Sequence, residues 1–337
     1  MPEQSFQGLP EDDRREALLV AAGRSGRPAY LLEKDLWVVW TLSALVGASF
    51  NHALTFKGGT SLSKAYRAIR RFSEDLDITY DIRTIAADLV ADNGGEVIPS
   101  TRNQERRWSR IIRERLAQWV IEQALPAIGA HFDDAGLDAQ ARADGDRVFV
   151  TYQPLFQDYG FVRPKVMVEF GARSTGDPRE KRLIECDAAI HLAEIAFPSA
   201  RPHVMLAERT FWEKATAAHV FCRQQRIRGD RLSRHWYDLI RLDEIEYGTR
   251  ALADRDLALD VARHKAVFFR ENDANGNVID YTAAVSGDLQ LVPEAPALGE
   301  LADDYARMAA GGMLLDDAEE FEAVMERCAD IQARVNR

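Results

Sequence analysis

Two aspartates separated by one residue, Asp75 and Asp77, have the spacing in this chain that most directly suggests chemistry. Residues 76–80 alternate between apolar and polar, which predicts a strand, and side chains at i and i+2 of a strand point to one face. Both carboxylates would then stand side by side while Leu76 points into the core. Two neighbouring carboxylates repel unless a cation lies between them, and such oxygen ligands suit Mg²⁺. Taken alone, the pair is more typical of a solvated edge strand.

A glycine-rich turn precedes these aspartates. It consists of Lys57-Gly58-Gly59-Thr60-Ser61, between an apolar strand predicted over 53–56 and a helix predicted over 62–70. Backbone N–H groups that begin a helix attract anions, and glycine lets a phosphate approach closely. When the glycines are considered alone, a plain strand-to-helix turn capped by Thr60 or Ser61 is the favoured interpretation.

A phosphate-cradling turn, a helix and an acidic strand in this order are typical of polymerase-β-type nucleotidyltransferases. That fold also needs a third carboxylate on an adjacent strand, and Glu169 provides one in the otherwise apolar strand predicted over 165–171. An isolated carboxylate in such a run is costly to bury without a partner. We therefore expect an α+β fold in which a mixed sheet with flanking helices carries the site.

After Pro198 and Pro202 the sequence pattern changes from mixed strands and helices to helices alone, which predicts two domains. These are a nucleotidyltransferase domain over 1–200 and a helical domain with an acidic C-terminal segment over 201–337. Residues 81–101 are expected to form a loop. Strands are expected at 53–56, 76–80, 147–153, 165–171 and 182–191, and helices at 12–23, 29–48, 62–70, 102–131, 206–225, 231–247, 254–271, 298–310 and 314–335.

Composition excludes several classes of protein. The chain of 337 residues is 46% hydrophobic and 29% charged, as expected of a protein with a sizeable core. Its three cysteines lie far apart without a CxxC pair, which excludes a disulfide framework and fits a reducing cytoplasm. The N-terminus is acidic and polar rather than signal-like, and no apolar run is long enough to span a membrane.

The net charge of −11 is unevenly distributed along the sequence. Residues 300–330 contain ten acidic residues and two arginines, whereas residues 101–115 and 223–235 each carry a net charge of +4. Basic clusters can bind a nucleic-acid backbone, and Trp108 lies within the first cluster and could stack on a base. An arginine-rich helix face paired with local acids is an equal alternative, and a solvated helix face is the favoured interpretation of the acidic segment. The nucleic-acid candidates are Arg106, Arg107, Arg110, Arg113, Arg226 and Arg228.

The motifs together resemble a known family. The runs FKGGTSLSKAY and RFSEDLDIT closely resemble the nucleotidyltransferase toxins of the AbiEii/AbiGii family, which includes the MenT toxins. The segment EKDLWV over 33–38, the run ERTFWEKA with Lys214, and the run RHWYD over 234–238 also resemble family segments. The likeness covers about residues 33–242, and it departs from the family pattern at His235, where members have an aspartate.

The resemblance implies a nucleotide-transfer mechanism. Two Mg²⁺ ions held by Asp75, Asp77 and Glu169 would bind an NTP and activate an acceptor hydroxyl, which attacks the α-phosphate as pyrophosphate leaves. Lys214 would neutralise charge on the leaving group, and Asp238 would be a catalytic contact or a brace. The nucleotide-binding residues are expected to be Lys57, Gly58, Gly59, Thr60, Ser61, Lys64 and Arg234.

The resemblance further implies a toxin of a toxin–antitoxin or phage-defence system, with the 3′ end of a tRNA as its acceptor and a co-encoded antitoxin as its partner. Two other classes stay open: a nucleotidyltransferase acting on a small molecule of the antibiotic type or on a protein, and a non-catalytic binding protein that retains the fold. The sequence favours a cytoplasmic protein without a membrane partner. It specifies neither the nucleotide nor the oligomeric state.

Overall fold

The computed structural model describes residues 4–157, 163–227, 231–311, 313–314 and 318–337. These residues form two compact units. Unit 1 comprises residues 1–65, 73–95 and 110–204, and unit 2 comprises residues 66–72, 96–109 and 205–337. The main division thus falls beside the expected boundary at 200. Two short segments, 66–72 and 96–109, belong to the helical unit although they precede that boundary.

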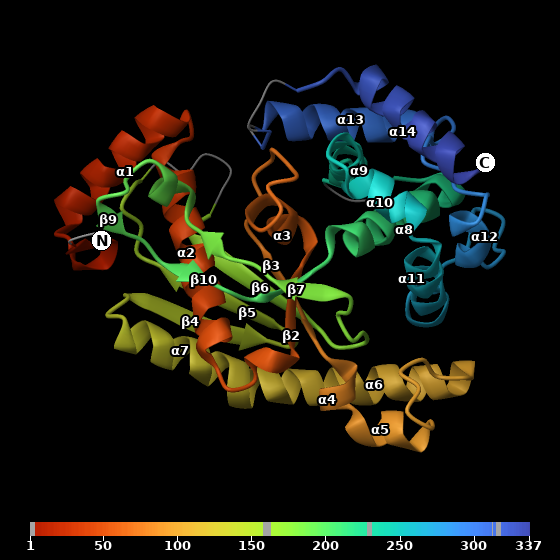
Figure 1. The fold of residues 1–337 in the computed structure, drawn as a ribbon, viewed down its shortest axis with the longest axis horizontal. Coiled ribbons are helices and arrows are strands. Elements are labelled where there is room, and N and C mark those ends of the chain that lie inside the picture. The colour runs from red at the N-terminus through yellow and green to blue at the C-terminus, as the bar shows by residue number, and fades with distance from the viewer. Residues whose placement is uncertain (1–3, 158–162, 228–230, 312, 315–317) are drawn as a thin grey trace. The chain divides into compact units, whose positions relative to one another are not determined.

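A seven-stranded mixed sheet forms the centre of unit 1 (Figure 1), with the strand order β4-β5-β6-β3-β2-β11-β7. Strand β3 is parallel to β6 and antiparallel to β2, while β5 is antiparallel to β4 and β6. The strands are β2 (Leu54–Lys57), β3 (Leu76–Tyr80), β4 (Ala139–Asp144), β5 (Arg147–Tyr152), β6 (Lys165–Gly171), β7 (Arg179–Lys181) and β11 (His203–Met205).

The two faces of this sheet differ in character because burial alternates along β5 and β6. The buried face carries Ile78, Val168 and Val150, each at most 1% exposed, and it packs against helices α2 and α7. Trp37 of α2 stacks on Tyr152 of β5, with ring centroids 4.6 Å apart. The opposite face carries the polar positions of the same strands. Charged side chains there are therefore held by a rigid, well-packed layer.

The helices of unit 1 follow largely from the apolar periodicity of the sequence. Helix α2 is buried along almost its whole length, and its charged residues, 33–35, lie near its beginning. The helices are α1 (Glu11–Ser25), α2 (Ala29–Gly47), α3 (Gly58–Lys64), α4 (Ile82–Ile85), α5 (Ala87–Asp92) and α7 (Leu125–Asp134). Helix α6 (Arg102–Trp119) continues through a π-helical segment (Val120–Ala124) into α7, and the division between the units falls within α6. Two small pairings complete unit 1: β1 (Gln4–Ser5) with β9 (Ile195–Ala196), and β8 (Ile184–Glu185) with β10 (Ser199–Ala200).

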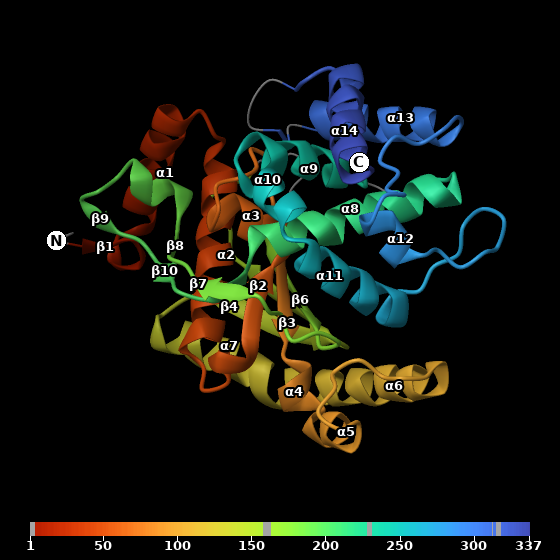
Figure 2. The same ribbon diagram turned by 45° about the vertical axis from the view of Figure 1, so that its right-hand side comes forward.

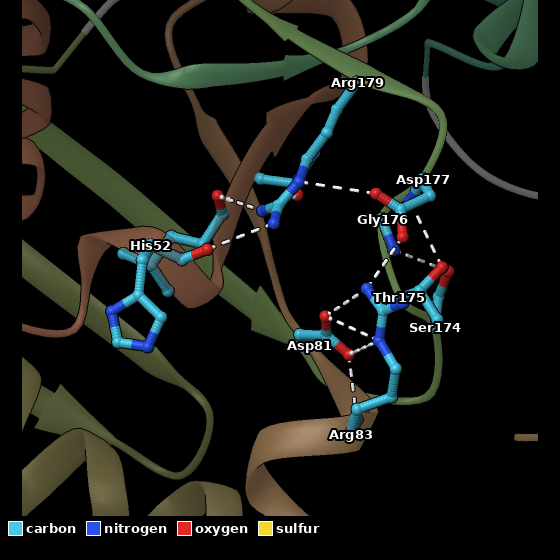
Figure 3. Close-up of polar contacts among 10 residues, drawn as sticks. His52, Asp81, Arg83, Ser174, Thr175, Gly176, Asp177 and Arg179 are labelled. Carbon is cyan, nitrogen blue, oxygen red and sulfur yellow. Dashed lines mark hydrogen bonds and ion pairs between the residues drawn. The ribbon is translucent and has the colours of Figure 1, made fainter. Parts of the chain in front are cut away.

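An ionic network anchors the connection between β6 and β7 onto β2 and α4 (Figure 3). The Arg83 side chain bridges Asp81 and Asp177, at 2.6 Å and 2.7 Å, and Asp81 also caps α4. Arg179 donates to the carbonyl oxygens of His52 and Leu54, each at 3.1 Å. These contacts fix the start of β2, which leads directly into the glycine turn.

Unit 2 consists mainly of helices (Figure 2). Helix α8 packs against α9, α10, α11 and α12, and α14 packs against α9. The helices are α8 (Ala207–Gln224), α9 (Arg234–Glu244), α10 (Tyr247–Ala253), α11 (Arg255–Phe268), α12 (Tyr281–Val285), α13 (Ala297–Ala310) and α14 (Phe321–Val335). None of the described helices of either unit has the length and hydrophobicity needed to cross a bilayer.

Most of the expected elements are confirmed, and four expectations are wrong. The helix expected over 62–70 ends at Lys64, because Arg67 has a left-handed backbone (φ 50°) and the chain turns into unit 2. The loop expected over 81–101 contains α4, which Asp81 caps, and α5. The strand expected over 182–191 is only β8 followed by a 3-10 turn (Asp187–Ile190), and α14 begins seven residues later than expected.

Candidate active site

The glycine turn and the second aspartate are packed against each other. Gly58 has φ +79°, a conformation that L-residues rarely adopt. A Cβ atom at this position would lie 2.0 Å from Oδ2 of Asp77. Glycine is therefore required twice here, by the backbone conformation and by the close approach of the Asp77 carboxylate.

The hydroxyl groups of the turn bond within the protein. Oγ1 of Thr60 donates to the carbonyl oxygen of Asp75 at 2.5 Å and lies 2.9 Å from Oγ of Ser73. The Ser61 hydroxyl donates to the carbonyl oxygen of Gly58 at 2.9 Å. Both side chains are at most 1% exposed. The turn consequently holds the start of β3 in place, and its contribution to an anion site would come from its backbone.

Four charged residues form a row across the sheet. Lys57 of β2 pairs in register with Asp77 of β3, Asp77 with Glu169 of β6, and Glu169 with Arg147 of β5. In-register neighbours place their side chains on the same face, so the two carboxylates are adjacent and each is flanked by a cation. Nη2 of Arg147 lies 3.0 Å from Oε2 of Glu169, with both side chains about half exposed. Asp75 immediately precedes β3, and the intervening Leu76 is fully buried, as expected.

Strand register brings two of the three expected metal-ligand candidates, Asp77 and Glu169, to one face of β3 and β6, and Asp75 immediately precedes β3. Among the described residues, no group of three or more His, Cys, Asp or Glu side chains already converges on a single point as a metal site would require. The donor set is nevertheless composed only of carboxylates, and Asp77 and Glu169 are held side by side by strand register. Such a set fits a hard divalent cation such as Mg²⁺, provided that the cation replaces Arg147 beside Glu169.

Helix α2 braces this site through charged residues that the sequence analysis quoted without a role. Nζ of Lys34 forms an ion pair with Glu74, the residue before Asp75, and donates to the carbonyl oxygen of Arg163 at 3.0 Å. Lys34 thereby joins the segment before β3 to the segment before β6. Its side chain is only 4% exposed. The sequence signal was a run of charges, 33–35, inside an otherwise apolar helix.

Lys64 at the end of α3 is part of a second buried brace. Its Nζ lies 2.5 Å from Oδ1 of Asp35 and 2.8 Å from Oδ1 of Asp187. Burial alone would lower the pKa of Lys64, but the two carboxylates outweigh it and raise the pKa. Burial and the nearby Asp187 raise the pKa of Asp35 to about 6. Lys64 is therefore engaged inside the protein, and we assign it a bracing role rather than a phosphate contact.

A separate buried charge cluster lies in unit 2. The Asp238 carboxylate accepts two hydrogen bonds from Arg71, at 2.7 Å and 2.9 Å, and forms an ion pair with Lys214 at 2.7 Å. Burial alone would raise the pKa of Asp238, but the two cations hold it well below its usual range. Burial, with the neighbouring Arg71 and Arg234, lowers the pKa of Lys214. One carboxylate thus balances several cations, so this cluster favours an additional anion.

Two residues of this cluster had no role in the sequence analysis. Arg71 fell just beyond the helix predicted over 62–70, and its partner Asp238 lies 167 residues later, so periodicity could not reveal the pair. His235, where the family pattern has an aspartate, has no hydrogen-bond partner on Nδ1 among the described residues. Burial and the cations Lys214 and Arg234 lower the pKa of His235 well below its ordinary value. The imidazole is therefore neutral at pH 7.

The first basic cluster lies on the exposed side of α6. The side chains of Arg106, Arg107, Arg110 and Arg113 are exposed, and among the described residues none of them forms an ion pair. The arginine that does pair with an acid is Arg115, with Asp88 at 2.6 Å. Trp108, expected to lie beside them as a stacking platform, is instead buried at 2% exposure.

The second basic cluster is only partly described. Arg226 is exposed, whereas Arg228 lies outside the described residues. The acidic segment contacts this region through backbone groups: Glu300 accepts from the amide of Ile227 at 2.7 Å, and Asp304 accepts from the amide of Ser233 at 2.7 Å. These acids of α13 therefore order the chain before α9.

The comparison with protein families decides the classification. The model described as "Nucleotidyl transferase AbiEii toxin, Type IV TA system" matches residues 40–327, which is most of the chain. The chain belongs to the AbiEii family. AbiEii proteins are nucleotidyltransferase toxins of type IV toxin–antitoxin systems. The expectation of a nucleotidyltransferase toxin is thereby confirmed. The match extends well beyond residue 242, where the recognised likeness ended, and it includes α13 and the first part of α14.

Other comparisons add little to the AbiEii assignment. Among solved structures, MenT4, the nucleotidyltransferase toxin Rv2826c from Mycobacterium tuberculosis H37Rv, matches with 20% sequence identity and a TM-score of 0.46. That match covers 97% of this chain and 90% of MenT4. No curated protein matches the chain significantly.

Proposed function

We propose that this AbiEii protein is a Mg²⁺-dependent toxin that transfers a nucleotide from an NTP to the 3′ end of a tRNA. The observation that carries the proposal is the register of Asp77 with Glu169, beside a glycine turn that leaves space for the Asp77 carboxylate. Asp75, Asp77 and Glu169 would hold the metal ions. When bound, these ions would neutralise phosphate charge and favour ionisation of the attacking hydroxyl.

The remaining steps are assigned to the chain's own groups. Lys57 and the backbone of residues 58–61 would orient the β- and γ-phosphates. The acceptor 3′-hydroxyl attacks the α-phosphorus, its proton is lost, and pyrophosphate leaves with the former bridging oxygen. In unit 2, Lys214 and Arg234 supply cationic charge for the anionic phosphates, and Asp238 holds Lys214 in place.

The exposed arginines of α6 favour a tRNA over a small acceptor. Unpaired arginines can neutralise backbone phosphates, which makes binding dependent on salt concentration. A small-molecule acceptor requires no such surface. We further propose that the protein acts in the cytoplasm and is neutralised by a co-encoded antitoxin, as in the type IV systems to which its family belongs.

The test uses the full chain with total tRNA, Mg²⁺ and each labelled NTP in turn. Label at tRNA 3′ ends supports the proposal. The Asp75→Asn and Asp77→Asn variants should transfer no label to tRNA. Label on small molecules or proteins but not on tRNA would contradict the tRNA acceptor. Unchanged growth inhibition by the Asp77→Ala variant would indicate a binding protein instead.

A charge variant separates the two acceptor classes. Neutralising four α6 arginines should abolish transfer to tRNA at physiological salt, because each lost phosphate contact weakens binding. Transfer that is unaffected would favour a small acceptor. The variant is Arg106→Gln, Arg107→Gln, Arg110→Gln and Arg113→Gln, and its control with the same net charge is Arg142→Gln, Arg201→Gln, Arg263→Gln and Arg337→Gln.

A further inference from the structure

A cavity of about 290 Å³ lies in unit 1 between the beginning of the chain, α1, α2 and the residues that follow β5. None of the residues assigned above to the nucleotide or to metal ions lines this cavity. Its wall includes Glu33 at the start of α2, which was part of the charged run that the proposed mechanism did not use. The cavity is therefore a separate candidate site.

Glu33 is a buried carboxylate with incomplete bonding. The residue is 2% exposed, and Oε1 accepts a hydrogen bond from the amide of Leu155 at 2.7 Å. Oε2 has no hydrogen-bond partner among the described residues. Burial raises the pKa of Glu33 to about 7, against the opposing effect of the backbone amides of Leu155 and Phe156 and of the charges of Arg14 and Arg15. A buried carboxylate that lacks a counterion is costly, so a cationic ligand would satisfy it.

Arg14 lines the same cavity but forms no ion pair with Glu33, and its buried Nε has no hydrogen-bond partner among the described residues. Nη1 of Arg14 donates to Oε1 of Gln7 at 3.1 Å. The cavity wall contains three acids, Glu11, Glu33 and Asp138, against this single cation. Glu11 also pairs with Arg15 at 2.7 Å. With Glu11 paired to Arg15, the acids Glu33 and Asp138 face Arg14, and the wall carries a small excess of negative charge once Glu33 is ionised.

Aromatic rings form another part of the wall. Trp37 and Trp40 of α2, with ring centroids 5.0 Å apart, line the cavity together with Phe6. Aromatic faces attract cations, and tryptophan is the most effective of them. The volume is at the lower end for ligand pockets, so it suits one head group with a short aliphatic stem rather than a whole nucleotide.

We propose that this cavity binds a guanidinium or primary ammonium group, with Glu33 as its counterion and the tryptophans as its walls. The group could belong to a free organic cation or to a basic side chain of a bound polypeptide, since both present the same chemistry. Binding a cation favours the ionised form of Glu33, so binding near pH 7 releases a proton. The proposal does not depend on nucleotide transfer.

Calorimetry on the full chain tests whether the cavity binds a cationic group and whether that group belongs to a free cation or to a polypeptide. The probes are agmatine, which is a free cation, and the peptide acetyl-Gly-Arg-Gly-amide, with acetyl-Gly-citrulline-Gly-amide as the uncharged control. Saturable binding of a charged probe, with proton release seen as a heat that depends on the buffer at pH 7, supports the site. Tighter binding of agmatine assigns a free cation, and binding of the peptide at least as tightly assigns a polypeptide. Failure of both charged probes to bind, or equal binding of the citrulline peptide, overturns the proposal.

A variant of the proposed counterion provides the second test. Glu33→Gln keeps the acceptor for the Leu155 amide and removes the charge, so it should weaken binding of the charged probe by about tenfold or more. Its folded state is checked by thermal unfolding at pH 5, where wild-type Glu33 is mostly neutral. Glu194→Gln, at an exposed acid that does not line the cavity, is the matched control. Equal binding by the folded Glu33→Gln protein and by Glu194→Gln overturns the proposal.

Discussion

The carboxylate of Asp77 occupies the space that a side chain at position 58 would need. The glycine turn and the acidic strand therefore depend on each other sterically and form one structural motif. Each of them taken alone fits an ordinary turn or an ordinary edge strand. Their contact explains why the two must occur together.

Replacing Gly58 with alanine should abolish nucleotide transfer and destabilise the fold by about 1–2 kcal/mol. The new Cβ would displace the Asp77 carboxylate, and φ +79° would be strained. Transfer assays and urea unfolding measure the two effects. Gly94→Ala is the control, because Gly94 has φ +71° but open space around its Cβ position. Equal activity of both alanine variants would show that the contact with Asp77 is irrelevant to transfer.

Replacing Arg147 with glutamine should lower the Mg²⁺ concentration needed for half-maximal transfer. The guanidinium competes with a metal ion for Glu169, and the pair is about half exposed, so the expected change is at most about fivefold. The measurement is a Mg²⁺ titration of transfer. Arg142→Gln removes an exposed charge from the neighbouring strand β4 without contacting Glu169. An increased Mg²⁺ requirement in Arg147→Gln alone would mean that Arg147 assists the metal site.

Replacing Lys34 with methionine should lower the free energy of unfolding by about 3–5 kcal/mol, since Glu74 would remain largely buried without its cation. Transfer should also fall, because Glu74 directly precedes Asp75. The double variant Lys34→Met/Glu74→Gln should recover part of the lost stability. A double-mutant cycle from denaturant unfolding measures this coupling, and strictly additive effects would refute the brace.

Replacing Asp238 with asparagine should lower stability at pH 7 by about 3–5 kcal/mol, because Arg71 and Lys214 lose their shared counterion. The pKa of Asp238 is lower in the folded state than in the unfolded chain. Its stabilisation is therefore complete above about pH 4 and declines as the pH falls below that value. The difference in the free energy of unfolding between the wild type and the Asp238→Asn variant should therefore become smaller as the pH falls below about 4. Asp260→Asn, in the exposed pair with Arg263, should show no comparable loss at any pH.

Replacing Glu33 with glutamine should have the opposite pH dependence. The folded pKa of about 7 lies above the unfolded value, so the contribution of Glu33 is favourable below about pH 4.5 and is lost as the pH rises to 7. Glutamine does not titrate. The variant should gain stability relative to wild type across that range, on the order of 3 kcal/mol. Urea unfolding of both proteins at pH 4.5, 6 and 8 measures this gain. A difference in the free energy of unfolding that stays the same at all three pH values would mean that Glu33 has an ordinary pKa.

Local pattern was sufficient to predict part of the site. Strand β3 and the strand that carries Glu169 follow from alternation, and the glycine turn follows from composition. The contacts that complete the site depend on strand register or on long-range packing. Arg147 reaches Glu169 because of the pairing of β5 with β6, and Lys34 reaches Glu74 across 40 residues. No periodicity in a single sequence encodes such distances.

The errors have the same physical origin. Trp108 was expected to stack on a base because it lies among arginines, but hydrophobic burial directs it inward while the arginines of the same helix point outward. Helix α3 ends early because residues 66–72 belong to the other unit, which local propensity does not reveal.

The chain passes between its two compact units five times, after residues 65, 72, 95, 109 and 204. Dividing the chain at one position therefore cannot separate the two units. A fragment that ends near residue 200 would still contain residues 66–72 and 96–109, which belong to unit 2. The remaining fragment would lack Arg71, the partner of its buried Asp238. A single exchange point in the gene therefore cannot transfer either unit intact.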